Sequence, residues 1–246
     1  MKHVLGITKR EFAGYFATPV AYVFIVIFLI LAALFTFSTD LGDFYNRGQA
    51  DLRPFFAFHP WLYLFLIPAV SMRLWAEERR LGTIELLMTL PVTTAQAVIG
   101  KFLAAWIFSG IALVLTFPVW ITVNYLGNPD NHAIAAGYIG SFLMAGGFLA
   151  IGSCVSAMTK NQVIAFVVSV VLCFMFLLSA FDTVIGFFQG WAPRSVVDAI
   201  ASFSFLSHFE AISKGVIDAR DLIFFGTLVA FFLFSNALIL ELKKAD

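Results

Sequence analysis

Residues 19–38 read PVAYVFIVIFLILAALFTFS, a stretch without a single charged side chain. An α-helix of about 20 apolar residues is long enough to cross the hydrocarbon core of a bilayer, which is roughly 30 Å thick. The stretch is too long for the apolar part of a cleaved signal peptide and lacks a convincing small-residue cleavage site. We therefore predict that it is a retained membrane-spanning helix.

The rest of the chain has the same character. Of its 246 residues, 61% are hydrophobic and 12% are charged, against about 45–50% and about 25% in soluble globular proteins. Formal net charge is zero, so the total charge gives no indication of nucleic-acid binding. We expect the lipid bilayer, and no nucleic acid, as a partner. Five further spans are predicted, at about residues 55–72, 102–123, 134–158, 163–181 and 222–240. The prediction is an all-α integral membrane protein of six transmembrane helices in one domain, residues 1–246.

Basic residues between the predicted spans orient the chain. The side that carries the termini holds the larger share: Lys2, Lys9, Arg10, Arg73, Arg79, Arg80, Lys101, Lys160, Lys243 and Lys244. The other side holds fewer: Arg47, Arg53, Arg194, Lys214 and Arg220. Because cytoplasmic loops carry an excess of lysine and arginine, we predict that both termini are cytoplasmic.

Residues 2–16 are predicted to form an interfacial helix. Leu5, Phe12 and Phe16 fall on one helical face, while Lys9 lies at its flank, where lysine can reach the headgroups. The alternative is that these residues are the frayed start of the first span.

Residues 182–221 are apolar but broken by Gly186, Gly190 and Pro193. Their many aromatic side chains favour short broken helices that dip into the outer leaflet before the last span. A soluble helical lid is the alternative interpretation.

Between the second and third predicted spans lies the longest run that a bilayer would reject, residues 73–101, RLWAEERRLGTIELLMTLPVTTAQAVIGK. A mixed-charge cluster at residues 77–80 precedes a Gly82-Thr83 break, and an apolar segment then runs up to Pro91. Such a segment suits a short amphipathic helix that docks into a groove on a soluble partner. The alternative is a solvated loop whose apolar residues rest on the headgroups.

The run E-E-R-R-L-G-T-I-E-L-L-M-T-L-P-V-T, followed by G-K, resembles the sequence after the second span of type-2 ABC transporter permeases. That pattern is approximately E-(K/R)-x-x-G-T-x-E-x-L-x-x-x-P-(V/I)-(S/T), then G-K. The matching residues are Glu78, Arg79, Gly82, Thr83, Glu85, Leu87, Pro91, Val92, Thr93, Gly100 and Lys101. The likeness extends over nearly the whole chain, and the small size is most similar to the gliding-motility-type subgroup.

The resemblance implies a non-catalytic permease subunit of an exporter in the bacterial inner membrane. No G-x-x-x-x-G-K-(S/T) loop occurs in the chain, so ATP and Mg²⁺ would be bound by a partner ATPase, and we expect no cofactor on this chain. Two permeases would pair with two ATPases, and some relatives add a periplasmic auxiliary subunit. The implied coupling helix is about Thr83 to Leu90, and the implied ATPase-coupling residues are Glu77, Glu78, Arg79, Arg80, Thr83, Glu85, Leu87 and Pro91.

Small residues recur on one face of the fourth predicted span, at Gly146, Ala150, Ser153 and Ala157. Their spacing of i, i+4, i+7 and i+11 allows close approach between helices. We expect packing within the subunit, and a dimer seam or transport path is the alternative.

Two other function classes fit the sequence less well. An intramembrane protease of the prenyl-protein type would need an arginine where Gly82 stands, and the scattered histidines, His3, His59, His132 and His208, offer no metal ligand set. An ion-coupled secondary carrier usually keeps ionisable residues inside its spans, and these spans are almost free of them. The transported substrate, and the choice between homodimer and heterodimer, stay open at this point.

Overall fold

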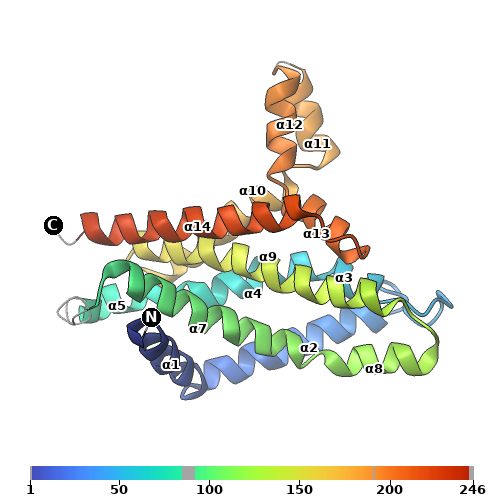
Figure 1. Ribbon diagram of the computed structural model, residues 1–246, viewed down its shortest axis with the longest axis horizontal. Coiled ribbons are helices and arrows are strands. Elements are labelled where there is room, and N and C mark those ends of the chain that lie inside the picture. The colour runs from blue at the N-terminus through green and yellow to red at the C-terminus, as the bar shows by residue number, and fades with distance from the viewer. Residues whose placement is uncertain (1, 85–91, 191, 244–246) are drawn as a thin grey trace.

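The structure is a computed structural model that describes residues 2–84, 92–190 and 192–243, and within these ranges it is helical with no strand (Figure 1). Most helices run alongside one another. The helices α1, α5 and the end of α14 lie at one end of the bundle, and α3 and α8 lie at the other. Their bounds are α1 Lys2–Phe16, α2 Pro19–Phe37, α3 Arg53–Ala57, α4 His59–Ser71, α5 Arg73–Leu81, α7 Thr94–Val114, α8 Phe117–Leu126, α9 Asn131–Met158, α10 Gln162–Leu178, α11 Asp182–Gln189, α12 Arg194–Ser202, α13 Phe205–Ser213 and α14 Ala219–Leu242.

Hydropathy located the long helices well. The predicted interfacial helix is α1, and the first, fourth and sixth predicted spans are the continuous helices α2, α9 and α14. Within the described ranges, four helical stretches are long and apolar enough to cross a membrane: α2, α7 with α8, α9 and α14. Counting two bent helix pairs, α10 with α11 and α12 with α13, raises the number to six. The all-helical membrane fold is confirmed, whereas the particular six-span topology stays a prediction.

The second predicted span, residues 55–72, which its prolines were expected to kink, is divided between two helices. Its centre is α4, which has only 13 residues and is separated from α3 at Phe58. The prolines explain the division, because Pro54 and Pro60 stand in the first turn of α3 and α4, where a missing amide N–H costs no helical hydrogen bond. Proline therefore starts two helices here, and Pro68 alone lies inside one.

The third predicted span, residues 102–123, covers parts of two helices. Its helix, α7, begins at Thr94, because the Thr93 hydroxyl accepts from the amide of Gln96 while the Gln96 side chain accepts from the amide of Thr93. The helix then ends at Val114, and α8 starts after a short break with Pro118 in its first turn. The fifth predicted span, residues 163–181, ends earlier than expected, with α10 at Leu178.

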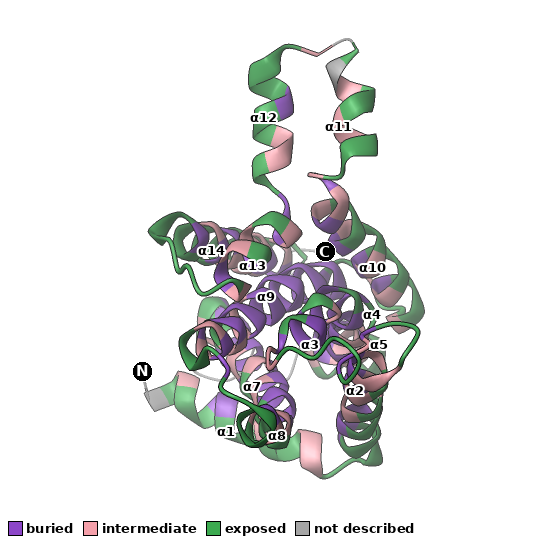
Figure 2. Ribbon diagram, turned by 90° about the vertical axis from the view of Figure 1, so that its right-hand side faces the viewer, coloured by how far each residue is buried: buried purple, intermediate pink, exposed green. Residues whose placement is uncertain are grey.

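Helix α9 is the centre of the bundle (Figure 2). It has 28 residues and packs against α4, α5, α7, α10, α13 and α14. Several of its positions are glycine, which lets neighbouring side chains approach its backbone. A Cβ at Gly152, for example, would lie 1.9 Å from the hydroxyl oxygen of Ser71 on α4.

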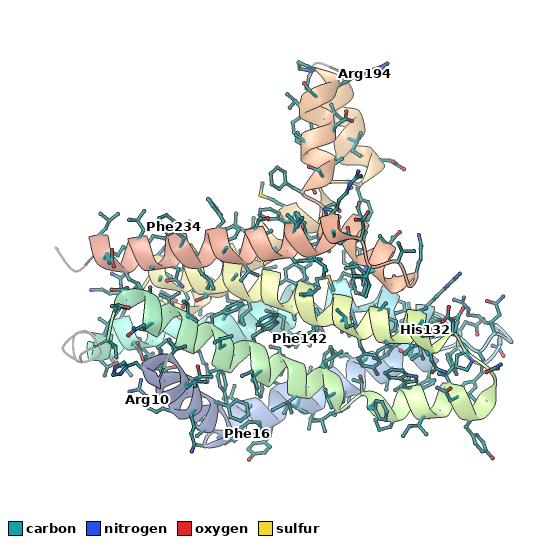
Figure 3. All side chains as sticks on the ribbon, viewed as in Figure 1. Arg10, Phe16, His132, Phe142, Arg194 and Phe234 are labelled. Atoms are coloured by element: carbon teal, nitrogen blue, oxygen red, sulfur yellow. The ribbon has the colours of Figure 1, made fainter. Side chains whose placement is uncertain are left out.

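The broken segment before the last span is confirmed as three short helices, α11, α12 and α13. The chain bends by 82° between α10 and α11, and α11 and α12 pack against each other as an arm that projects away from the bundle (Figure 1). Arg194 lies at the tip of this arm (Figure 3). In contrast, α13 returns to the bundle and packs on α9, with Phe205, Phe209 and Ile212 buried.

Candidate functional site

Helix α5 carries the charged cluster, and its start is fixed to α9 while a glycine ends it. At its start, the hydroxyl of Ser156 on α9 accepts hydrogen bonds from the amides of Trp75 and Ala76, at 3.1 and 3.0 Å, and donates to the carbonyl of Met72 at 2.9 Å. A helix leaves its first amides without partners, so a side chain from α9 satisfies two of them. At its end, Gly82 adopts the left-handed conformation with φ 72°, which glycine adopts without strain. The predicted break at Gly82 is therefore confirmed.

Three charged residues meet where α5, α1 and α7 come together. The ammonium of Lys101 on α7 lies 2.8 Å from Glu78 of α5 and 3.0 Å from Glu11 of α1. The Lys101 side chain is only 4% exposed, and its ammonium also lies 5.3 Å above the ring of the buried Trp75. A buried ammonium is tolerated because two carboxylates surround it. This Glu11–Lys101–Glu78 network joins three helices through one side chain.

The electrostatics of Glu11 reflect this arrangement. Burial alone would raise the pKa of the Glu11 carboxyl. The positive charge of Lys101, together with hydrogen bonds from Arg10 and Lys101, outweighs that effect and holds the pKa below its ordinary value of 4.5. Glu11 is thus ionised at neutral pH and pairs with Lys101 as a charged carboxylate.

The residue before Lys101 lets α1 reach this position. A Cβ at Gly100 would lie 2.8 Å from the Ile7 side chain, so only glycine allows the two helices to approach so closely. The hydroxyl of Thr8 donates to the carbonyl of Gly100 at 3.2 Å across the same contact. The Gly100-Lys101 pair, found in the sequence through its resemblance to a motif, therefore forms the contact between α7 and α1.

The predicted coupling residues divide into two groups on α5. Glu77 and Arg80 face outward, with side chains 40% and 60% exposed and a separation of 4.0 Å. Glu78 is turned inward to Lys101, and Arg79 donates to the carbonyl of Ala157 at the end of α9. The two inward residues hold α5 against the bundle, which leaves Glu77 and Arg80 accessible to a partner.

The remaining predicted coupling residues lie mostly beyond the described part of the chain. Thr83 is exposed, and its hydroxyl donates to the carbonyl of Glu78 at 3.4 Å. Glu85, Leu87 and Pro91 belong to residues 85–91, which lie outside the described residues, as does most of the predicted coupling helix from Thr83 to Leu90.

The predicted seam of small residues, Gly146, Ala150, Ser153 and Ala157, lies within this one chain and is buried throughout. A Cβ at Gly146 would lie 2.9 Å from the Trp106 indole of α7, and the Ser153 hydroxyl accepts from Asn236 of α14 at 2.8 Å. Nearby, Phe142 of α9 stacks on the same indole with ring centroids 4.4 Å apart. These positions bring α7 and α14 against α9.

The histidines do not form a shared site. His59 is fully buried, with its Nδ1 2.7 Å from the Ser141 hydroxyl, whereas His208 lies 2.6 Å from Asp221 near the start of α14. Among the described residues, no group of three His, Cys, Asp or Glu side chains is placed to hold a metal ion.

Sequence reasoning missed the buried network. It treated Lys101 as a loop charge because a charged residue interrupts an apolar stretch. The signal that could have placed it is the capping pair Thr93 and Gln96, which starts α7 before Lys101 and so puts the lysine inside a helix. No comparable signal pairs it with Glu11, which is 90 residues away in the sequence.

Comparison with known proteins shows the family of the chain. A family model described as ABC-2 family transporter protein matches residues 7–240, which is nearly the whole chain and includes most of α1 and all of α5 and α7. No curated protein matches the sequence. With its helices apolar enough to cross a membrane, the chain belongs to the ABC-2 family of transporter proteins and is a transmembrane subunit of an ABC transporter.

Proposed function

We propose that this subunit forms the translocation path of an ATP-driven exporter and is moved by a separate ATPase that docks on the segment following α5. The ATPase would bind ATP and Mg²⁺, and this chain would bind neither. The proposal places both termini, and hence the docking segment, on the cytoplasmic side of a bacterial inner membrane. The excess of lysine and arginine on that side supports this orientation.

The observation that carries the proposal is the set of contacts that α5 makes at its two ends. Glu78 joins α5 to α7 and α1 through Lys101, while Arg79 and the Ser156 hydroxyl join it to α9. A force on residues 83–90 would thus act on three helices of the bundle together. Ion pairs at the surface would transmit less of this force, since exposed ion pairs are weak and easily rearranged.

The physical basis of coupling is differential contact. When two ATPases close on ATP, each would carry its docked segment with it, and the permease would shift to the conformation that fits the closed pair. A ligand can shift such an equilibrium only by as much as its affinity differs between the two states. The buried Lys101 contacts make α5 move with α1 and α7 rather than independently of them.

The outward charges Glu77 and Arg80 are the proposed ATPase contacts. The test is ATP hydrolysis by the reconstituted complex of this chain with its ATPase, measured with Arg80→Ala and Glu77→Ala. Losing one charged contact at the edge of an interface should reduce the stimulation of hydrolysis several-fold. Arg53→Ala is the matched control, because Arg53 is also an exposed arginine, 72% against 60% for Arg80, and lies at the opposite end of the bundle (Figure 1). Unchanged stimulation in both α5 variants would remove these residues from the proposal.

The assembly is proposed with two ATPases and a second permease copy or homologue, and with a periplasmic auxiliary subunit as an optional member. Export, rather than import, is tested with inside-out vesicles, in which an exporter accumulates cargo upon ATP addition. Membership of the gliding-motility-type subgroup stays a prediction, which co-purification of a large periplasmic subunit with the complex would support.

A further inference from the structure

A groove of about 440 Å³ runs between α1, α2, α4, α5 and α7. Along most of its length it is apolar, lined by side chains such as Val23, Ile27 and Leu66 from α2 and α4. At the end where α1 and α5 lie, it is lined instead by charged residues, among them Arg73 and Glu78. The groove is partly open, and exposed apolar residues of α2 form one of its edges. The groove therefore offers an apolar part and a charged end, which match the two parts of an amphiphilic molecule.

Two charged groups at this end have unused hydrogen-bonding atoms. The Nε of Arg73 is buried and has no hydrogen-bond partner among the described residues. The same holds for the Oε2 of Glu78, whose other carboxylate oxygen contacts Lys101. A buried donor or acceptor without a partner is costly, so such atoms are usually satisfied by a ligand or by water. Arg73 and Glu78, the residues that carry these two atoms, both line the groove.

We propose that this groove binds one phospholipid whose headgroup carries both a phosphate and a primary ammonium. The phosphate accepts from the Arg73 guanidinium, and the ammonium donates to the Glu78 carboxylate. One acyl chain occupies the apolar part of the groove. The lipid comes from the leaflet on the side of α1 and α5, because the charged end of the groove lies there.

Charge and volume exclude the other membrane amphiphiles. The groove is lined by three carboxylates, Glu11, Glu77 and Glu78, and by two cations, Arg73 and Lys101. A headgroup with phosphate alone would add a further negative charge to this excess of carboxylates, and a headgroup without phosphate would leave Arg73 unpaired. The volume is within the range of about 300–1,000 Å³ that small-molecule sites occupy, and it suits one chain and a headgroup better than two chains. The second chain remains in the bilayer, beside the open edge of the groove. This binding does not depend on coupling to an ATPase.

The first test fills the groove. Gly14 lines it, and a Cβ at this position meets nothing within 4 Å, so Gly14→Leu places a side chain in the groove without a clash. Gly6 is the matched control, because it lies in the same helix, has equally open space around its Cβ and does not line the groove. The full chain is purified in mild detergent, supplied with phosphatidylethanolamine vesicles and examined by native mass spectrometry. We expect one bound lipid in the natural chain and in Gly6→Leu, and at least a tenfold lower bound fraction in Gly14→Leu.

The second test addresses the headgroup. Arg73→Gln should weaken phosphatidylethanolamine binding by about tenfold, the effect of losing one charge-assisted hydrogen bond, whereas Arg53→Gln, at an exposed arginine that does not line the groove, should leave binding unchanged. The natural chain should bind phosphatidylethanolamine more tightly than phosphatidylglycerol or diacylglycerol. Equal occupancy in all four variants would overturn the site. Preference for phosphatidylglycerol would overturn the assignment of a zwitterionic headgroup.

Discussion

Replacing Lys101 with methionine tests the buried network directly. Methionine keeps an unbranched chain of similar size but removes the ammonium, so Glu78 and Glu11 would lose their shared partner and face each other as like charges. The Lys101 side chain is 4% exposed, whereas the two carboxylates are 20% and 21% exposed. Removing one member of a buried ion pair costs about 3–5 kcal/mol, and since the carboxylates keep some contact with water, we expect a loss of about 3 kcal/mol.

The measurement is reversible unfolding in mixed micelles of a mild detergent and dodecyl sulfate, followed by tryptophan fluorescence. A double-mutant cycle with Glu11→Gln isolates the pair, and its coupling free energy should be about 1 kcal/mol or more. Arg10→Gln is the control, because it removes a neighbouring ion pair of Glu11 from an arginine that is 56% exposed, and such pairs contribute about 0.2–1 kcal/mol. A loss below about 1 kcal/mol for Lys101→Met, or no coupling to Glu11, would refute the buried network.

Three further outcomes are expected. Folding lowers the pKa of the Glu11 carboxyl, so the contribution of its charge to the free energy of unfolding is complete above the unfolded pKa of about 4.5 and is lost as pH falls through the lower folded pKa. Below about pH 4.5, the free energy of unfolding of Glu11→Gln should therefore depend less on pH than that of the natural chain. Ser156→Ala leaves two buried amides at the start of α5 without an acceptor and should cost about 1–3 kcal/mol in the same unfolding assay. Gly152→Ala forces a methyl group against Ser71 and should lower the free energy of unfolding by about 1–3 kcal/mol, while Gly226→Ala, with open space around its Cβ, should not lower it.

The long helices could be predicted because burial in lipid and burial in protein both select the same apolar residues. Hydropathy therefore found α2, α9 and α14 to within three residues at each end. It failed at α3, α4, α7 and α8, where helix ends are set by local backbone chemistry. Pro54, Pro60 and Pro118 start helices, and the Thr93–Gln96 capping pair begins α7 earlier than the apolar run does. Those signals are in the sequence, but a hydropathy average does not include them.

From the sequence, the site could be located only as a segment of the chain, without the direction of each side chain. The charged cluster at residues 77–80 was recognised as a unit, yet the direction of each side chain depends on partners from distant parts of the chain. Glu78 and Arg79 are adjacent in the sequence but contact different helices, α7 and α9. Which of four neighbouring charges faces the bundle is decided by where α7 and α9 lie, and that is tertiary information.

The close packing around α9 limits the substitutions that this sequence can accept. At Gly137, Gly140 and Gly152, any larger residue would collide with a neighbour, with Cβ contacts of 2.5, 2.8 and 1.9 Å. By contrast, the part of the exposed face of α2 that lies outside the groove, with Val26 and Ile30 more than half exposed, tolerates exchange among apolar residues of any shape. Related sequences should therefore conserve residue volume along α9 and only hydrophobicity along the exposed face of α2. The record of substitutions in such relatives would then distinguish the helix at the centre of the bundle from a helix at its periphery.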